Sequence, residues 1–202
     1  MTTSRLEAFS DGVLAIIITI MVLELELPHE ATWAGLGESA TGFLTYALSF
    51  VYVGIYWNNH HHMFQVVERI SGGVLWANLA LLFWLSLFPF TTKWMDETGF
   101  EQAPTVVYGI NLLLAALAFY AVQRTIMAGG GGDRLRAVLG RDLKGMLSPL
   151  VYLAGMALTE LSPVLGVAAY VGGAVVWLVP DRRVERFLAD EGAATGADRD
   201  VA

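Results

Sequence analysis

Long runs of apolar residues, separated by short polar stretches, dominate the sequence as far as residue 180. Six such runs can be marked off, at about 11–27, 42–64, 72–92, 104–127, 146–162 and 164–180. Each is close to the roughly 17 to 25 residues that an α-helix needs to cross a hydrocarbon layer about 30 Å thick. The pattern therefore predicts an all-α membrane protein with six transmembrane helices.

The segments around these runs predict a simple domain organisation. Residues 1–181 are predicted to form one transmembrane domain, and the polar residues 182–202 a disordered cytoplasmic tail. The last two runs are short and separated only by Ser162-Pro163, so a re-entrant hairpin is an alternative to two crossings. Gly129–Gly132 predict a flexible loop, and DRLRAVLGRDLK after them is typical of a short interfacial helix.

Composition agrees with a membrane protein and excludes several other classes. The 202 residues are 55% hydrophobic and only 15% charged, which is typical of a polytopic membrane protein. Cysteine is absent, so disulfides and thiolate metal sites are excluded. The net charge of −7 gives no support for a nucleic-acid partner. The first run has no small-residue cleavage site, so we expect it to stay in the mature protein.

Basic residues are strongly biased to one side of the predicted topology. With six crossings, Lys93 lies on one side, and the other side holds Arg5, Arg69, Arg124, Arg134, Arg136, Arg141, Lys144, Arg182, Arg183, Arg186 and Arg199. Basic residues collect on the cytoplasmic side, so both termini are predicted to be cytoplasmic in a multi-pass protein of the plasma membrane. The opposite side is acidic, and such a surface concentrates cations.

The charge-free part of the first run is too short for a helix that faces lipid on all sides. The stretch between Asp11 and Glu24 spans only about 18 Å as a helix, against about 30 Å of hydrocarbon. A charge within a membrane span is costly and normally faces protein or a water-filled cavity. The sequence therefore predicts that other helices shield the first one.

One face of this helix is predicted to be aliphatic. At 100° per residue, a narrow stripe is formed by Ile16, Ile20, Leu23 and Leu27, with Thr19 at its edge. Asp11 lies about 140° from Ile16 around the helix axis, away from the stripe. Glu24 and Glu26 flank the outer end of the stripe, where they predict a pore mouth. A packing surface between helices is the simpler interpretation of such a stripe, and periodicity alone does not separate the two.

Polar residues at the inner end of the second run are expected at the depth of Asp11, because the two helices are antiparallel. The candidate partners of Asp11 are Asn58, Asn59, His60, His61 and His62, and Arg5 is expected to join them. We predict a structural lock; a proton-sensitive gate is the alternative, because histidine titrates near physiological pH. Adjacent histidines point about 100° apart on a helix, so no metal site and no other cofactor is predicted.

Proline and tryptophan positions carry simpler predictions. Pro89 is predicted to kink or end the third run, because proline cannot donate a helical hydrogen bond. The tryptophans are interpreted as interface belts and packing residues; they are Trp33, Trp57, Trp76, Trp84, Trp94 and Trp177.

The N-terminal segment contains a long motif, Arg5-x-x-x-Phe9-Ser10-Asp11-Gly12, which continues into Val13-x-Ala15-Ile16-x-x-Thr19. This motif resembles the signature of the transmembrane protein 175 family of potassium channels, in its single-repeat prokaryotic branch. The similarity extends to the six-span topology, the histidines of the second run and SLFPFTT in the third. It covers most of residues 5–180, although the last two runs match only in hydropathy.

This resemblance implies a homotetramer in which four copies of the first helix surround a path for monovalent cations. It places the selecting hydrophobic rings at Ile16, Ile20 and Leu23, with the Thr19 hydroxyl beside the constriction. Like the family, this sequence lacks the Thr-Val-Gly-Tyr-Gly filter. An aliphatic ring offers an ion no replacement ligands, so it favours the more weakly hydrated potassium modestly over sodium and can close by losing its water.

Two other function classes fit the sequence less well. A proton-coupled secondary transporter would use Asp11 and the histidines as a proton relay, but the paired Gly/Pro helix interruptions that mark such transporters are not found. An intramembrane enzyme is disfavoured, because the sequence has no Gly-x-Ser-x-Gly, no His-Glu-x-x-His and no paired aspartates at mid-depth. The expected function is a passive potassium channel with a hydrophobic constriction.

Overall fold

A computed structural model describes residues 2–65, 67, 70–129 and 143–178 of the chain. The described residues are helical with no strand, which confirms the all-α prediction for this part. The helices are α1 (Thr3–Leu23), α2 (Trp33–Glu38), α3 (Ala40–Gln65), α4 (Gly72–Ser86), α5 (Phe88–Glu97), α6 (Gln102–Ala128), α8 (Leu143–Thr159) and α9 (Pro163–Leu178). The predicted tail 182–202, residues 130–132 of the glycine loop and most of the predicted interfacial helix lie outside the described residues.

Four stretches in the described residues are long and apolar enough to cross a membrane, so the chain is a multi-pass membrane protein. They are α1, α3, the consecutive pair α4 and α5 (Gly72–Glu97) and α6, with mean hydropathies of 2.1, 1.2, 1.7 and 2.0. They correspond to the first four predicted runs. α8 and α9 are apolar but have only 17 and 16 residues, about 24–26 Å of helix. Membrane crossing by these two helices stays a prediction.

The third predicted run is divided into two helices at Leu87. The backbone N–H of Leu87 bonds to the carbonyl of Trp84 at 3.3 Å, closing α4, and α5 then begins at Phe88 with Pro89 in its first turn. Proline is tolerated in a first helical turn, where its missing N–H costs no helical bond. The prediction that Pro89 kinks or ends this run is confirmed.

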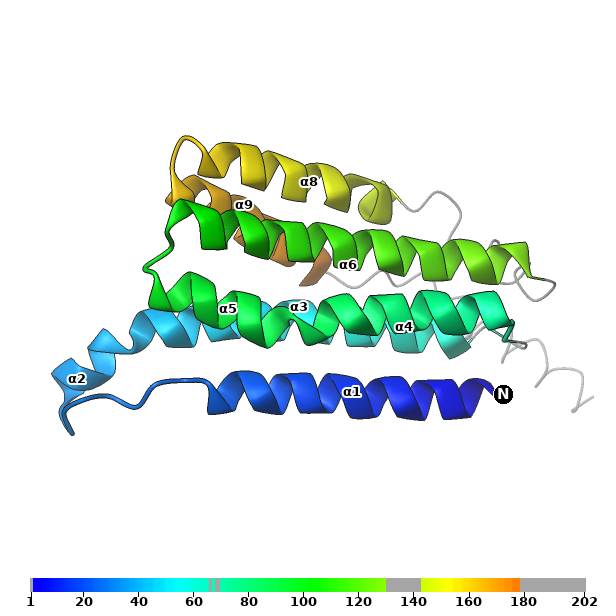
Figure 1. The fold of residues 1–202 in the computed structure, drawn as a ribbon, viewed down its shortest axis with the longest axis horizontal. Helices are drawn as coiled ribbons and strands as arrows, with labels where there is room; N and C mark the ends of the chain where they lie inside the picture. The colour runs from blue at the N-terminus through cyan, green and yellow to red at the C-terminus, as the bar shows by residue number, and fades with distance from the viewer. Residues whose placement is uncertain (1, 66, 68–69, 130–142, 179–202) are drawn as a thin grey trace, which may run out of the picture.

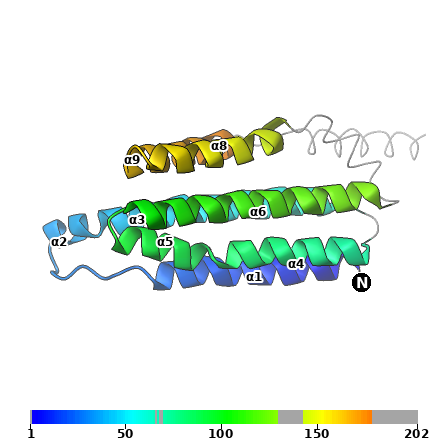
Figure 2. The ribbon, with the colours of Figure 1, turned by 45° about the horizontal axis from the view of Figure 1, so that its top comes forward.

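The long helices alternate in direction along one axis of the molecule (Figure 1). α1 packs against α3, α4 and α5, whereas α8 packs against α6 and α9. Turning the molecule places the α8–α9 hairpin on one side of the bundle and α1 on the opposite side (Figure 2). α1 therefore forms an outer wall of the protomer, with one face covered and one face open.

Tyr170 anchors α9 against α3 and α6. Its ring is fully buried, its backbone carbonyl accepts a hydrogen bond from Tyr52 Oη at 2.6 Å, and its own hydroxyl lies 3.3 Å from the carbonyl of Thr105. Gly109 on α6 makes room for this ring, because a Cβ added there would lie 2.1 Å from Tyr170 Oη. These contacts join α3, α6 and α9 through buried polar groups that are satisfied, as a low-dielectric interior requires.

Candidate pore-lining helix

The two faces of α1 differ sharply in burial. One face is buried against the bundle and consists of Leu6, Ser10, Leu14, Ile17 and Met21, which recur every three or four residues. The other face is open: Ile16 is 58% exposed, Ile20 41% and Leu23 80%. The neighbouring Ile17 is only 3% exposed, so adjacent isoleucines have opposite environments. The predicted aliphatic stripe is therefore unburied within its own protomer.

Thr19 is also exposed, at the edge of this aliphatic stripe and about 60° from Ile16 on the helix. Its hydroxyl donates a hydrogen bond to the carbonyl of Ile16, one turn earlier, with 2.9 Å between the oxygens. The hydroxyl proton is thus engaged, and the oxygen lone pairs stay free to accept from water or to face a cation. Thr19 is the polar group of an otherwise aliphatic surface.

The outer end of α1 differs from the prediction. The helix ends at Leu23, and Glu24 caps it with a backbone N–H bond of 3.1 Å to the carbonyl of Ile20. The prediction that the helix continues to Leu27 is wrong, because carboxylates oppose the negative end of the helix dipole and Pro28 disfavours helical geometry at the residue before it. Glu26 and Leu27 are exposed beyond the helix, whereas Glu24 forms an ion pair with Lys93 on α5.

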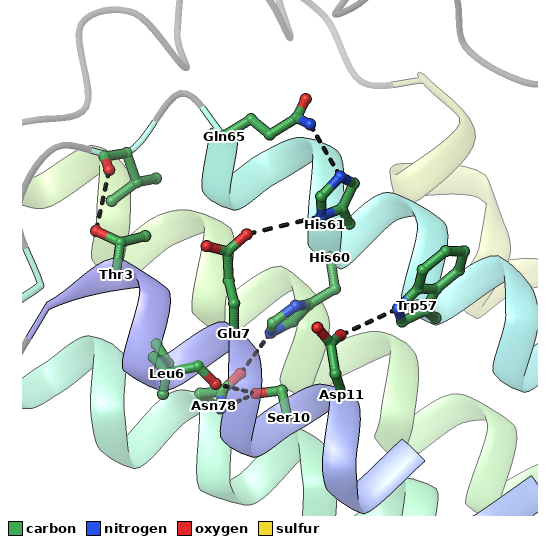
Figure 3. A network of polar contacts seen from close by, with 11 residues as sticks. Thr3, Leu6, Glu7, Ser10, Asp11, Trp57, His60, His61, Gln65 and Asn78 are labelled. Carbon is green, nitrogen blue, oxygen red and sulfur yellow. Dashed lines mark hydrogen bonds and ion pairs between the residues drawn. The ribbon is translucent and has the colours of Figure 1, made fainter. Parts of the chain in front are cut away.

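A buried polar chain connects the inner half of α1 to α3 and α4 (Figure 3). Ser10 Oγ donates to the carbonyl of Leu6 at 2.9 Å and accepts from Asn78 Nδ2 at 3.0 Å. Asn78 Oδ1 lies 2.8 Å from His60 Nε2. Because the Asn78 amide nitrogen donates to Ser10, its oxygen accepts, which assigns the proton of neutral His60 to Nε2. Ser10, Asn78 and His60 are all at most 2% exposed.

Asp11 does not belong to this buried chain. Its Oδ1 accepts a hydrogen bond from the indole Nε1 of Trp57 at 3.0 Å, and both side chains are exposed in the protomer. The prediction that a histidine or an asparagine binds Asp11 is wrong, because Trp57 occupies the position on α3 directly opposite it. Trp57, interpreted from the sequence as an interface-belt or packing residue, donates a hydrogen bond to Asp11 of the motif.

His61 is connected to Glu7, one turn before Asp11 on α1. His61 Nδ1 lies 3.7 Å from Glu7 Oε1, His61 Nε2 lies 2.9 Å from Gln65 Nε2, and the His61 ring stacks on Trp57 with centroids 6.1 Å apart (Figure 3). Sequence reasoning missed Glu7 and Asn78. A lone asparagine in the apolar stretch VLWANLALLFW is the signal that points to Asn78, because a buried amide needs polar partners.

The remaining motif residues lie around these contacts without a hydrogen bond to Asp11 in the described part of the chain. Arg5 and Gly12 are exposed, and Phe9 is 49% exposed. Asn58 and His62 are half-buried on α3, and the His62 ring lies 6.0 Å from that of His61. The structure thus brings Ser10 and His60 together through Asn78, while Arg5, Asn58 and His62 stay outside that chain.

Comparison with known proteins assigns a family to this arrangement. The sequence profile described as "Endosomal/lysosomal potassium channel TMEM175" matches residues 5–89, which include most of α1 and the whole of α3 and α4. A protein described as a potassium channel, from Chryseobacterium sp. (strain P1-3), is 47% identical over 189 residues, covering 93% of this chain and 98% of that protein. The Gallus gallus endosomal/lysosomal proton channel TMEM175 is 31% identical over 135 residues, or 64% of this chain and 26% of that protein.

The fold agrees with the sequence match. The crystal structure of a lysosomal potassium-selective channel TMEM175 homolog from Chamaesiphon minutus superposes with a TM-score of 0.75 and 28% identity, covering 88% of this chain and 96% of that one. The relatives are ion channels and not enzymes, and they handle cations in a membrane. This chain therefore belongs to the TMEM175 family, as a prokaryotic member of these potassium channels.

Proposed function

We propose that the chain assembles as a homotetramer in the plasma membrane and forms a channel modestly selective for potassium over sodium. Its pore is lined by the open face of α1, with Ile16, Ile20 and Leu23 as stacked aliphatic rings. The observation that carries the proposal is the exposure of these three side chains, at 58%, 41% and 80%, on a helix whose opposite face is buried. A helix with one covered and one open face can line a pore when copies surround an axis.

Contact with sister copies explains the open face better than contact with lipid does. Asp11 is exposed on the same helix, about 140° from Ile16, and a carboxylate facing hydrocarbon is costly. The inner half of the open face includes three exposed small residues, Ala8, Gly12 and Ala15, and a Cβ added at Gly12 would meet no atom within 4 Å. Small residues let helices approach closely in membranes.

The selection mechanism follows from the chemistry of the lining. Rings of isoleucine and leucine supply no oxygen ligands, so a permeating ion must keep part of its hydration shell. Potassium holds its water less strongly than sodium does, and it passes with the smaller penalty. Thr19 offers a hydroxyl oxygen within the aliphatic surface and eases this partial dehydration. The same rings can lose their water and close, which makes the filter a gate as well. Glu26 and Leu27 lie at the outer mouth.

Flux through purified protein in liposomes tests this proposal. The wild type should pass potassium faster than sodium, and Ile16→Asn should raise both fluxes and reduce their ratio, because an amide hydrates the ring. Val22→Asn is the matched control: Val22 is also exposed, at 45%, but points about 120° away from Ile16 on the helix. Unchanged flux in Ile16→Asn, or equal effects of the two variants, would remove Ile16 from the pore.

The same liposomes separate the channel from a proton-coupled transporter using Asp11 and the histidines. A channel passes potassium down its own gradient without an imposed proton gradient, and its flux does not saturate at low concentration. Coupled uptake would require the proton gradient and would favour the transporter. Four-fold symmetry in electron micrographs of the purified protein is the expected result for the assembly, and a monomer would contradict the proposal.

A further inference from the structure

Lys93 connects the outer end of α1 to α5. Its ammonium group forms an ion pair with the Glu24 carboxylate, at the residue that caps α1, and lies 3.6 Å from Glu97 one turn further along α5. In the sequence segments 24–42 and 87–105, which flank the outer ends of the first four runs, Lys93 is the single Lys or Arg among several carboxylates. An isolated cation between two carboxylates on different elements is well placed to fix their relative position.

The chain has little other support at this point. The last backbone bonds to α1 come from the N–H groups of Glu24 and Leu25, and residues 26–32 then form no helix until α2 begins at Trp33. Leu23 is the outermost aliphatic residue of the open face and immediately precedes Glu24. Because Glu24 is the residue that the ion pair holds, the position of Leu23 depends directly on Lys93.

The direction of this restraint follows from the packing of α1. α5 contacts α1, and the buried face of α1 carries Ile17 and Met21, while Leu23 is on the open side. A bond from Glu24 to α5 therefore draws the end of α1 towards its own protomer and away from the open face. We propose that Lys93 is a positioning residue of the pore: with Glu24 it forms a strap that holds the Leu23 ring open. This inference rests on the proposed function.

The surroundings of the strap define how strong it is. A hollow of about 390 Å³ adjoins the pair and is lined by Glu24, Pro89, Phe90, Lys93, Trp94 and Glu97. Water reaches the two charges there, so the strap is a solvent-exposed ion pair of modest strength that salt screens. Its loss should reduce potassium current by about two- to fivefold, the range expected for an exposed pair.

Two single substitutions separate a strap from a simple surface charge. Lys93→Met removes a positive charge and Glu24→Gln removes a negative one, yet each breaks the strap, so both should lower the potassium current. If the residues acted only through the field at the mouth, Lys93→Met would raise cation current and Glu24→Gln would lower it. Opposite signs, or no change in either variant, would overturn the proposal.

Glu97→Gln is the matched control, because it removes a carboxylate from the same lysine without touching α1. At the same ionic strength, its current should change less than that of Lys93→Met or Glu24→Gln, because the pair between Lys93 and Glu24 stays intact. The double exchange Glu24→Lys with Lys93→Glu re-forms the ion pair with its charges reversed. Made in the Glu97→Gln background, which avoids repulsion at position 93, it should restore the current lost in the single variants. Failure of the exchange to recover any current, in protein that elutes as the wild-type assembly, would overturn the strap.

A structural readout separates failure of the strap from failure of the proposed pore. The chain contains no cysteine, so Leu27→Cys gives one labelling site, on a residue that is 86% exposed beyond α1. A spin label there should become more mobile when Lys93→Met is added. Unchanged mobility would overturn the strap whatever lines the pore. Raised mobility of the label with unchanged potassium current would mean that the strap exists but does not act on a pore. This result would overturn the positioning role of Lys93 and would count against α1 as the pore-lining helix.

Discussion

Trp57 and Asp11 form a direct hydrogen bond between α3 and α1, with 3.0 Å between Nε1 and Oδ1. One turn nearer the inner end, His61 and Glu7 make the next contact, 3.7 Å between Nδ1 and Oε1. Each step of four residues along α1 is matched by four residues along α3, as antiparallel helices require. The pair of contacts therefore fixes the register of α1 against α3.

Trp57→Phe removes the donor to Asp11 but keeps an aromatic ring against His61. We expect a loss of about 1 kcal/mol in the free energy of unfolding, the usual contribution of one hydrogen bond, and a melting temperature a few degrees lower in detergent. Trp76→Phe is the control, because Trp76 is 76% exposed on α4 and makes no hydrogen bond with the residues that the structure describes. Equal melting temperatures of the two variants would show that the Trp57–Asp11 bond adds nothing to stability.

Asn78→Leu tests the buried chain between α1, α3 and α4. The substitution leaves the His60 Nε2–H without an acceptor inside the protein, while Ser10 keeps its bond to the Leu6 carbonyl. An unsatisfied buried donor costs about 1–3 kcal/mol, so the melting temperature should fall clearly. Asn59→Leu is the control and should change little, because among the described residues the bond of Asn59 Nδ2 goes to the carbonyl of Ile55 on its own helix.

The double variant Asn78→Leu with His60→Phe gives an internal check. Replacing both partners by apolar groups removes the unsatisfied donor, and such replacements are often close to neutral. His60 already lies against an aromatic ring, with its centroid 4.5 Å from that of Phe64, so phenylalanine has a suitable neighbour there. The double variant should be more stable than Asn78→Leu alone. A double variant as unstable as the sum of the single ones would contradict the proposed pairing.

Periodicity in the sequence is sufficient to predict the two faces of α1. Ile16, Ile20 and Leu23 share one side by helical geometry alone, and the structure leaves that side open. The first four apolar runs and the break at Pro89 were predictable for the same reason, because helix length and proline chemistry act locally. These features need no knowledge of how one helix is rotated against another.

The polar partners were not predictable, because they depend on that rotation. His60, His61 and His62 are adjacent in sequence, yet His60 faces Asn78 in the core and His61 faces Glu7. A rotation of 100° per residue sends neighbours to different helices, and nothing local indicates which histidine faces which helix. The sequence therefore indicated a polar lock at the right depth and assigned Asp11 the wrong partner.

The end of α1 was misjudged for an energetic reason. Counting hydrophobic positions extends the stripe to Leu27, because LELELP keeps apolar residues at regular intervals. Glu24 and Glu26 place negative charge at the negative end of the helix dipole, Pro28 disfavours helical geometry at Leu27, and Glu24 pairs with Lys93 on α5. That contact joins residues 69 positions apart in sequence, so no local pattern contains it.

Gly109→Ala tests how Tyr170 anchors α9. The added methyl group would lie 2.1 Å from Tyr170 Oη and 2.8 Å from Met156 Cγ, so α6 and α9 must separate or the ring must move. Overpacking of this kind costs about 1–3 kcal/mol, and we expect a lower melting temperature.

Gly172→Ala is the matched control on α9, where an added Cβ meets no atom within 4 Å and alanine favours helix. It should be neutral or slightly stabilising. Adding Tyr170→Phe to Gly109→Ala should recover part of the loss, because it removes the oxygen nearest to the new methyl group, although Tyr170 Cζ would still lie 2.8 Å away. If Gly109→Ala melts at the wild-type temperature, then Tyr170 does not fix the spacing between α6 and α9.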